Sequence, residues 1–120
     1  MISKMQAAQI IDKLTELTQH NLIKWESGHP APYMNGPDSR VDLVYTTEHI
    51  GRQVRIYLYH FKFYLDEDRY TWDSEINFEF IDNSGNSLGM LPKTPNAFDL
   101  LRSIQYQNPQ VGHFYDDLFK

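Results

Sequence analysis

The chain has 120 residues, enough for one domain with its own core, and it has no cysteine, which excludes disulfides, thiolate metal sites and a cysteine nucleophile. Its formal net charge of −5 argues against non-specific binding of DNA or RNA, which requires clustered lysine and arginine. No segment approaches the roughly 20 apolar residues of a membrane helix, and the first residues lack the apolar core of a signal peptide. We therefore expect a single cytoplasmic domain with no membrane contact.

The first predicted element is an amphipathic helix over residues 4–19. Ser3 and Gln6 have the spacing of a capping box, in which each side chain bonds the backbone amide of the other residue. Asn21 suits the end of this helix because asparagine tolerates the left-handed conformation. The apolar stripe at helical spacing consists of Ile10, Ile11, Leu14 and Leu17.

Residues 27–39 are predicted to form a long loop without regular structure. The segment reads S-G-H-P-A-P-Y-M-N-G-P-D-S, with three prolines and two glycines. A loop of this length within a compact domain is more often functional or disordered than a simple connection.

Four strands are predicted over residues 40–48, 53–65, 70–82 and 87–91. The second, Q-V-R-I-Y-L-Y-H-F-K-F-Y-L, is rich in β-branched and aromatic residues and would lie at the centre of an antiparallel sheet. A three-residue loop, 49–51, would pair Glu48 with Arg52. A four-residue turn, 66–69, would pair Leu65 with Tyr70.

A helix over residues 95–106 and a last short amphipathic helix near the C-terminus follow the strands. Thr94 and Pro95 suit the N-cap and first position of the former helix. The element order favours an α+β fold: a four-stranded antiparallel meander, with the N-terminal helix and one or two C-terminal helices packed on one face.

The expected pairing places two kinds of surface on the outer face of the sheet. Lys62 would lie opposite Asp73 and His60 opposite Glu75, either as cross-strand ion pairs or as a charged binding patch. An apolar patch beside them would need a covering segment or a partner. The patch consists of Val44, Val54, Ile56, Leu58 and Ile81.

Arg55 is predicted to point to the inner face. Its guanidinium either reaches solvent at the sheet end or binds an anionic ligand. The sequence contains neither a phosphate-binding glycine loop nor an H-E-x-x-H metal motif, so no cofactor and no metal are expected.

The opening segment I-I-D-K-L-T-E-L-T-Q-H-N-L-I-K-W-E-S, Ile10 to Ser27, resembles the start of small bacterial and phage accessory proteins. In those proteins an amphipathic helix ending in L-T precedes an I-K-W-E-like segment and a small sheet. The resemblance implies a microbial or phage accessory protein and carries over no functional residue.

These features favour a non-catalytic protein-binding or inhibitory accessory protein, phage-encoded or immunity-like, that acts through the acidic and apolar sheet face on a basic partner or as a homodimer. One alternative is a module that binds a small anionic nucleotide or metabolite in a Tyr/Trp/Arg pocket. A small hydrolase using His60 and Glu75 is a third hypothesis. The candidate binding residues are Val44, Arg55, Ile56, Leu58, His60, Lys62, Asp73 and Glu75, with Trp25, Tyr33 and Trp72.

Overall fold

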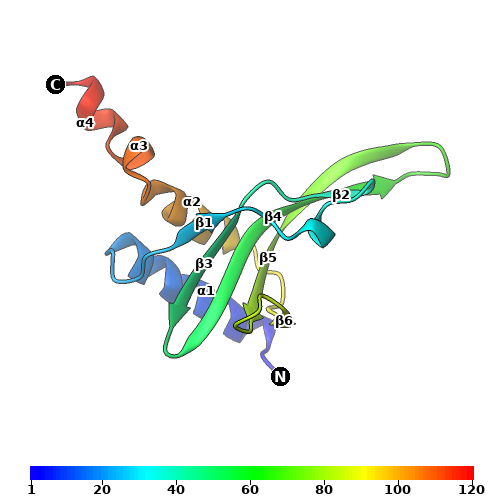
Figure 1. Cartoon of the computed structure of the whole chain (residues 1–120), viewed down its shortest axis with the longest axis horizontal. Helices are drawn as coiled ribbons and strands as arrows, with labels where there is room; N and C mark the ends of the chain where they lie inside the picture. The colour runs from blue at the N-terminus through cyan, green and yellow to red at the C-terminus, as the bar shows by residue number, and fades with distance from the viewer. The chain divides into compact units, whose positions relative to one another are not determined.

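The computed structural model describes residues 1–120 and has an α+β architecture, as predicted. Figure 1 shows an N-terminal helix, an antiparallel sheet and small C-terminal helices. The chain divides into two compact units, one formed by Met1–Glu26 with Leu91–Lys120 and the other by Ser27–Met90. Each unit is described by itself.

The helical unit begins with α1, Lys4–Gln19, which has the predicted bounds. Ser3 caps it: the Gln6 amide donates to Ser3 Oγ at 3.1 Å, and the Ser3 amide donates to Gln6 Oε1 at 2.9 Å. Asn21 follows the helix with a positive φ of 57°, as its residue type predicts. With 16 residues α1 is the longest helix, and no helix combines the length and hydropathy needed to cross a membrane.

The second main helix, α2, spans Ala97–Tyr106 and starts two residues later than predicted, with Asn96 in place of Thr94 as its N-cap. Asn96 Nδ2 donates to the Ala8 carbonyl at 2.9 Å, which ties the start of α2 to α1. At the other end, Gln107 Nε2 donates to the Ile23 carbonyl at 2.6 Å. Two short helices follow, α3 (Pro109–Gly112) and α4 (Phe114–Leu118), and neither contains a buried residue.

The sheet has six strands, two more than predicted. In order along the sheet they run β1-β3-β4-β5-β6, and β2 pairs with β4. The two additional strands, β1 and β2, lie in or beside the segment expected to be an irregular loop, which also contains a 3₁₀ turn over Pro32–Met34. That expectation is therefore wrong in part. The strands are β1 (Glu26–Gly28), β2 (Ser39–Arg40), β3 (Val44–His49), β4 (Arg52–Tyr64), β5 (Tyr70–Ile81) and β6 (Ser87–Met90).

The predicted register between β3 and β4 is wrong by one residue. The connecting loop has two residues, because His49 pairs directly with Arg52. Both loop residues have a positive φ, 53° at Ile50 and 72° at Gly51, which is the pattern of a type I′ turn. This turn could not be predicted from the sequence, because Ile50 is β-branched and such residues rarely adopt a positive φ.

The register between β4 and β5 also differs from the prediction by one residue. Tyr64 pairs with Tyr70 and Lys62 with Trp72, so the expected pairs of Lys62 with Asp73 and of His60 with Glu75 do not form. Strand β4 carries apolar residues on both faces, so the hydrophobic pattern fits either register.

Both faces of the sheet are buried near its centre, and the residues of the expected apolar patch divide between these two faces. Val44 pairs with Tyr57, and both pack with Met34 and Val41. Ile56 belongs to the opposite face, because adjacent strand residues alternate. The exposed fractions of Val44, Val54 and Ile56 are 7%, 6% and 0%, so this patch needs no partner to cover it.

Candidate protein-interaction site

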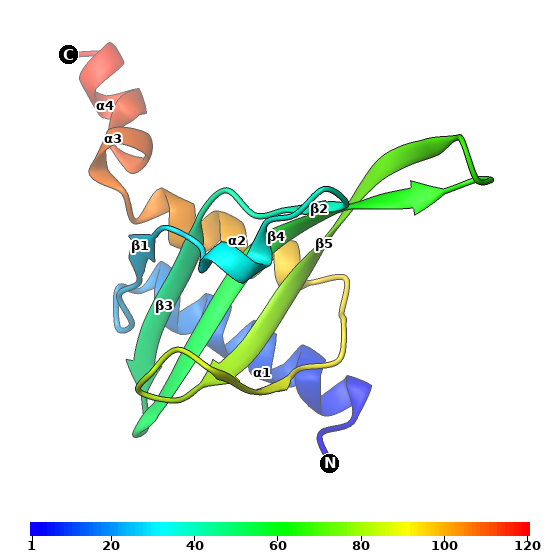
Figure 2. The same ribbon diagram turned by 45° about the vertical axis from the view of Figure 1, so that its right-hand side comes forward.

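The outer halves of β4 and β5 continue beyond the sheet as a two-stranded ribbon, which we call the arm (residues 63–74). Strand β2 pairs with β4 at Phe61 and His60, and the arm begins beyond that pairing (Figures 1 and 2). Every residue from 63 to 74 is exposed. The pairing between β4 and β5 nevertheless runs without interruption to Tyr64 and Tyr70, so the arm has a defined backbone.

The tip of the arm is an acidic turn with its own hydrogen bonds. Asp66 Oδ1 accepts from the amides of Asp68 and Arg69 at 2.9 and 3.0 Å, and Asp66 Oδ2 accepts from Arg69 Nε at 2.7 Å. The hydrogen bond from Arg69, followed by those of the backbone amides, lowers the pKa of Asp66. The tip therefore presents the carboxylates of Asp66, Glu67 and Asp68 on an ordered turn.

One face of the arm, the aromatic face, consists of Tyr64, Tyr70 and Trp72, with Lys62 at its base. Lys62 Nζ lies 4.3 Å from the ring centroid of Tyr70 and 5.8 Å from that of Trp72, within the range of cation–π attraction. Tyr70 also packs on Tyr64 at 5.7 Å and on Trp72, edge to face, at 6.4 Å. These contacts hold the three rings in place, yet 45–52% of each of them stays exposed.

The opposite face of the arm, the acidic face, consists of Phe63 and Asp73, with Phe61 and Glu75 at its base. Phe61 pairs across the strands with Asp73, and Tyr59 pairs with Glu75. Phe61 stacks on Tyr59 with ring centroids 5.7 Å apart, whereas Phe63 is 54% exposed. Aromatic rings on β4 thus lie opposite carboxylates on β5 on this face.

Asp38 in the preceding loop fixes the base of the arm. Its carbonyl accepts from the Lys62 amide at 2.9 Å, and its Oδ1 accepts from the Tyr64 hydroxyl at 2.7 Å. The hydrogen bond to the Asp38 carboxylate raises the pKa of Tyr64, because the carboxylate disfavours the tyrosinate. The loop therefore orients the aromatic face.

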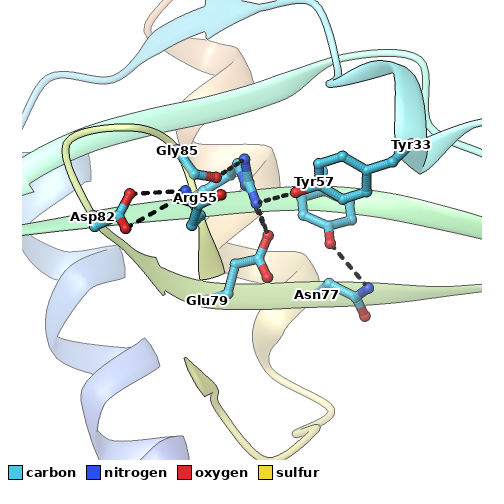
Figure 3. A network of polar contacts seen from close by, with 8 residues as sticks. Tyr33, Arg55, Tyr57, Asn77, Glu79, Asp82 and Gly85 are labelled. Carbon is cyan, nitrogen blue, oxygen red and sulfur yellow. Dashed lines mark hydrogen bonds and ion pairs between the residues drawn. The ribbon is translucent and has the colours of Figure 1, made fainter. Parts of the chain in front are cut away.

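A buried polar network lies at the centre of the sheet (Figure 3). Arg55 Nε and Nη2 both donate to Glu79 Oε1, the former at 2.7 Å, and the two side chains are only 7% and 4% exposed. Arg55 also donates to the Gly85 carbonyl at 3.2 Å and to the Tyr33 hydroxyl at 3.3 Å. Burial acts to lower the pKa of Arg55, but the hydrogen bonds and charge of Glu79 and Tyr33 hold it above its usual value.

Tyr57 and Asn77 extend this network along the same face. Asn77 Nδ2 donates to the Tyr57 hydroxyl at 3.4 Å, and the Arg55 guanidinium lies 5.9 Å from the Tyr57 ring. Burial raises the pKa of Tyr57, so this phenol stays neutral at pH 7. The expectation that Arg55 reaches solvent at the sheet end is wrong, because its guanidinium is enclosed and bonded to the protein itself.

The structure brings together only some of the predicted binding residues. Lys62 and Trp72 share the aromatic face, and Asp73 and Glu75 share the acidic face. His60 Nε2 lies 3.8 Å from Asp42 Oδ2 rather than beside Glu75. The remaining candidate residues do not lie on the arm. Val44, Arg55 and Ile56 are buried and Leu58 is half-buried. The Tyr33 hydroxyl accepts a hydrogen bond from Arg55, and Trp25 in the helical unit donates one to Thr18.

Phe63, Tyr64, Leu65 and Tyr70 were not among the candidate binding residues, because apolar and aromatic residues are typical of core positions. Strand length was the available signal. Strand β4 has 13 residues and β5 has 12, whereas β3 and β6 have 6 and 4. Strands this short cannot flank the whole hairpin, so part of it must lie outside the sheet.

Residues 1–120 contain no group of three or more His, Asp or Glu side chains placed to hold a metal ion. Comparison of the chain with protein-family models, with curated proteins and with solved structures finds no match.

Proposed function

We propose that this chain is a non-catalytic protein-binding or inhibitory accessory protein, and that the arm is its contact surface. The observation that carries the proposal is the exposure of Tyr64, Tyr70 and Trp72 on a hydrogen-bonded ribbon that holds them in fixed positions. Tyrosine and tryptophan are the residues most enriched among binding hot spots. Rings that are already ordered lose little conformational entropy when a partner covers them.

The charge of the arm indicates the kind of partner. Asp66, Glu67 and Asp68 at the tip stand close in sequence to Asp73 and Glu75, whereas the cations of this region are Lys62 and Arg69. Arg69 pairs with Asp66 at 2.7 Å, and Lys62 lies over Tyr70. A protein with a basic rim around an apolar depression would complement this surface, and the opposite charges would accelerate association.

The N-terminal resemblance to phage and bacterial accessory proteins agrees with such a role. The alternative of an anionic ligand pocket gains no support from Arg55, which already donates to Glu79, Gly85 and Tyr33.

The test compares what wild-type and variant proteins retain from a lysate of the native cells. Trp72→Ala and Tyr70→Ala remove exposed rings, so their folding should be unchanged by circular dichroism. A hot-spot loss of at least about 2 kcal/mol would weaken the binding of the retained protein roughly 30-fold. Leu22→Ala is the matched control, because Leu22 is 69% exposed and lies outside the arm. A partner that binds both arm variants as tightly as the wild type would show that the arm is not the contact surface.

A further inference from the structure

Strand β5 has an open edge along the arm. Strand β6 pairs with β5 only at Glu79, Phe80 and Ile81, so no strand lies beyond β5 from Tyr70 to Phe78. The outer side of β4, in contrast, is paired with β3 and then with β2. The hairpin therefore has one edge that is covered as far as Phe61 and one edge that no strand covers from Tyr70 to Phe78.

The turn hydrogen bond shows which backbone groups point outward from that edge. The Leu65 amide donates to the Arg69 carbonyl at 2.8 Å, so these two residues form a hydrogen-bonded pair. In an antiparallel ladder such pairs alternate with non-hydrogen-bonded ones, so Thr71, Asp73 and Glu75 bond β4. The residues between them point their N–H and C=O groups away from β4; these are Tyr70, Trp72, Ser74 and Ile76.

The open edge is accessible and has few of the features that keep another strand from pairing with it. Tyr70 through Ser74 are exposed, and β5 has neither proline nor a bulge in its twelve pairs with β4. Natural edge strands are usually protected by such features. Asp73 makes one protecting contact, because its Oδ1 accepts from the outward Ser74 amide at 2.8 Å.

We propose that this edge binds an extended segment of the partner by β-strand addition, and that the segment alternates basic and apolar residues. The inference rests on the proposed function and specifies how the arm makes its contact. Cross-strand neighbours share a face, so residues opposite Trp72 would pack on the aromatic face and those opposite Asp73 would meet carboxylates. Apolar and basic side chains, respectively, complement these two faces.

A second copy of this chain fits the edge less well. Antiparallel pairing of two β5 edges would bring the Asp73 and Glu75 carboxylates of both copies together, and like charges across a ladder are destabilising. Light scattering distinguishes this occupant, because a concentration-dependent dimer that Ser74→Pro abolishes would overturn the proposal of a basic partner strand.

The probes are synthetic nine-residue peptides. The first alternates Lys and Val, the second alternates Glu and Val, and the third is the Lys/Val peptide with alternate backbone amides methylated. Amide hydrogen exchange followed by NMR is the measurement. At a peptide concentration 100 times the Kd, the Lys/Val peptide should slow exchange at Tyr70 and Trp72 about 100-fold. Equal protection by the Glu/Val or methylated peptide, or no protection by the Lys/Val peptide, would overturn the proposal.

Ser74→Pro blocks the edge at the backbone without changing a ring. The Ser74 amide points away from β4, so proline removes no bond between the two strands and only the local bond from this amide to Asp73 Oδ1. Edge positions of this kind tolerate proline. We expect this variant to keep the dispersed NMR spectrum of the wild type and to bind the Lys/Val peptide at least tenfold more weakly. Ser74→Thr retains the N–H and should bind as the wild type does.

The same variants separate this inference from the proposed function. If Ser74→Pro binds the protein partner as the wild type does while Trp72→Ala loses it, strand addition is wrong and the arm remains the contact surface. If both variants bind the partner normally, the proposed function fails as well. Loss of the partner in Ser74→Pro, with binding preserved in Ser74→Thr, supports both.

Discussion

Replacing Glu79 by glutamine should destabilise the protein strongly, because it leaves the Arg55 cation buried without a counter-charge. In the native structure Glu79 Oε1 accepts from both Nε and Nη2 of Arg55, and the two side chains are 4% and 7% exposed. After the substitution, the neutral oxygens of Gly85 and Tyr33 and one amide oxygen would remain as acceptors. Breaking a buried pair in this way costs about 3–5 kcal/mol.

Equilibrium unfolding in urea measures this effect as a fall in the free energy of unfolding. A domain is typically stable by about 5–15 kcal/mol, so the loss would be a large part of the total. Arg69→Ala is the control, because Arg69 and Asp66 form an exposed pair, and exposed pairs contribute little to stability.

The double variant Arg55→Met/Glu79→Leu tests the cause of that loss. It removes both charges and fills the space with apolar atoms, so we expect stability within about 1 kcal/mol of the wild type, or above it. If Glu79→Gln costs no more than Arg69→Ala, or if the double variant is as unstable as the single one, the desolvated charge does not explain the network.

Three further measurements test other parts of the structure. Ile50→Asn should raise the free energy of unfolding in urea by about 1 kcal/mol, because asparagine before glycine suits the type I′ turn. Ile50 is 76% exposed, so the substitution loses little buried apolar surface. A destabilised variant would contradict the assigned turn. In NMR titrations of the native protein, the pKa of Asp82 should lie below its ordinary 3.8, because the Asn86 amide donates a hydrogen bond to this carboxylate, and in urea the pKa should return to its ordinary value. The stability that this turn contributes is then present above the pKa of the unfolded state and lost as the pH falls through the pKa of the folded state. The pKa of Tyr64 should lie above 10.0, and its contribution to the stability of the fold is present below that pH and lost as the pH rises through the raised pKa. Asp38→Ala should bring the pKa of Tyr64 back toward 10.0, and an unchanged titration in this variant would show that the hydrogen bond is absent in solution.

Local chemistry was sufficient to predict the first helix. The Ser3 and Gln6 capping box, an apolar stripe of period 3.6 and Asn21 at the end all act within a few residues of one another. No distant contact is needed to decide them, and the observed bounds, Lys4–Gln19, agree with the prediction.

The strand registers could not be predicted because they depend on tertiary packing. Tyr57 and Ile56 are both buried although they point to opposite faces, so alternation between apolar and polar residues is lost along β4. The register could then be predicted only from the type of turn. The turn type was not evident, because Ile50 has a positive φ that a β-branched residue disfavours. With this shift of one residue, Val44 and Lys62, which were expected on the same face of the sheet, lie on opposite faces.

The arm was missed for a related reason. Phe63, Leu65 and Trp72 have the composition of core residues, and composition alone does not show whether other strands are long enough to flank them. The acidic turn of Asp66, which local hydrogen bonding determines, was located correctly, and Trp72 and Asp73 of the arm were among the candidate binding residues.

The division of the chain into one continuous unit and one interrupted unit has a consequence for the order of folding. The sheet unit, Ser27–Met90, contains mostly hairpins that close short loops. The helical unit is completed by Gln107, which bonds the Ile23 carbonyl from 84 residues away. Closing long loops costs more chain entropy and slows folding, so we expect the hairpins to form first during synthesis. We expect α1 to pack against α2 only after the C-terminal segment has left the ribosome.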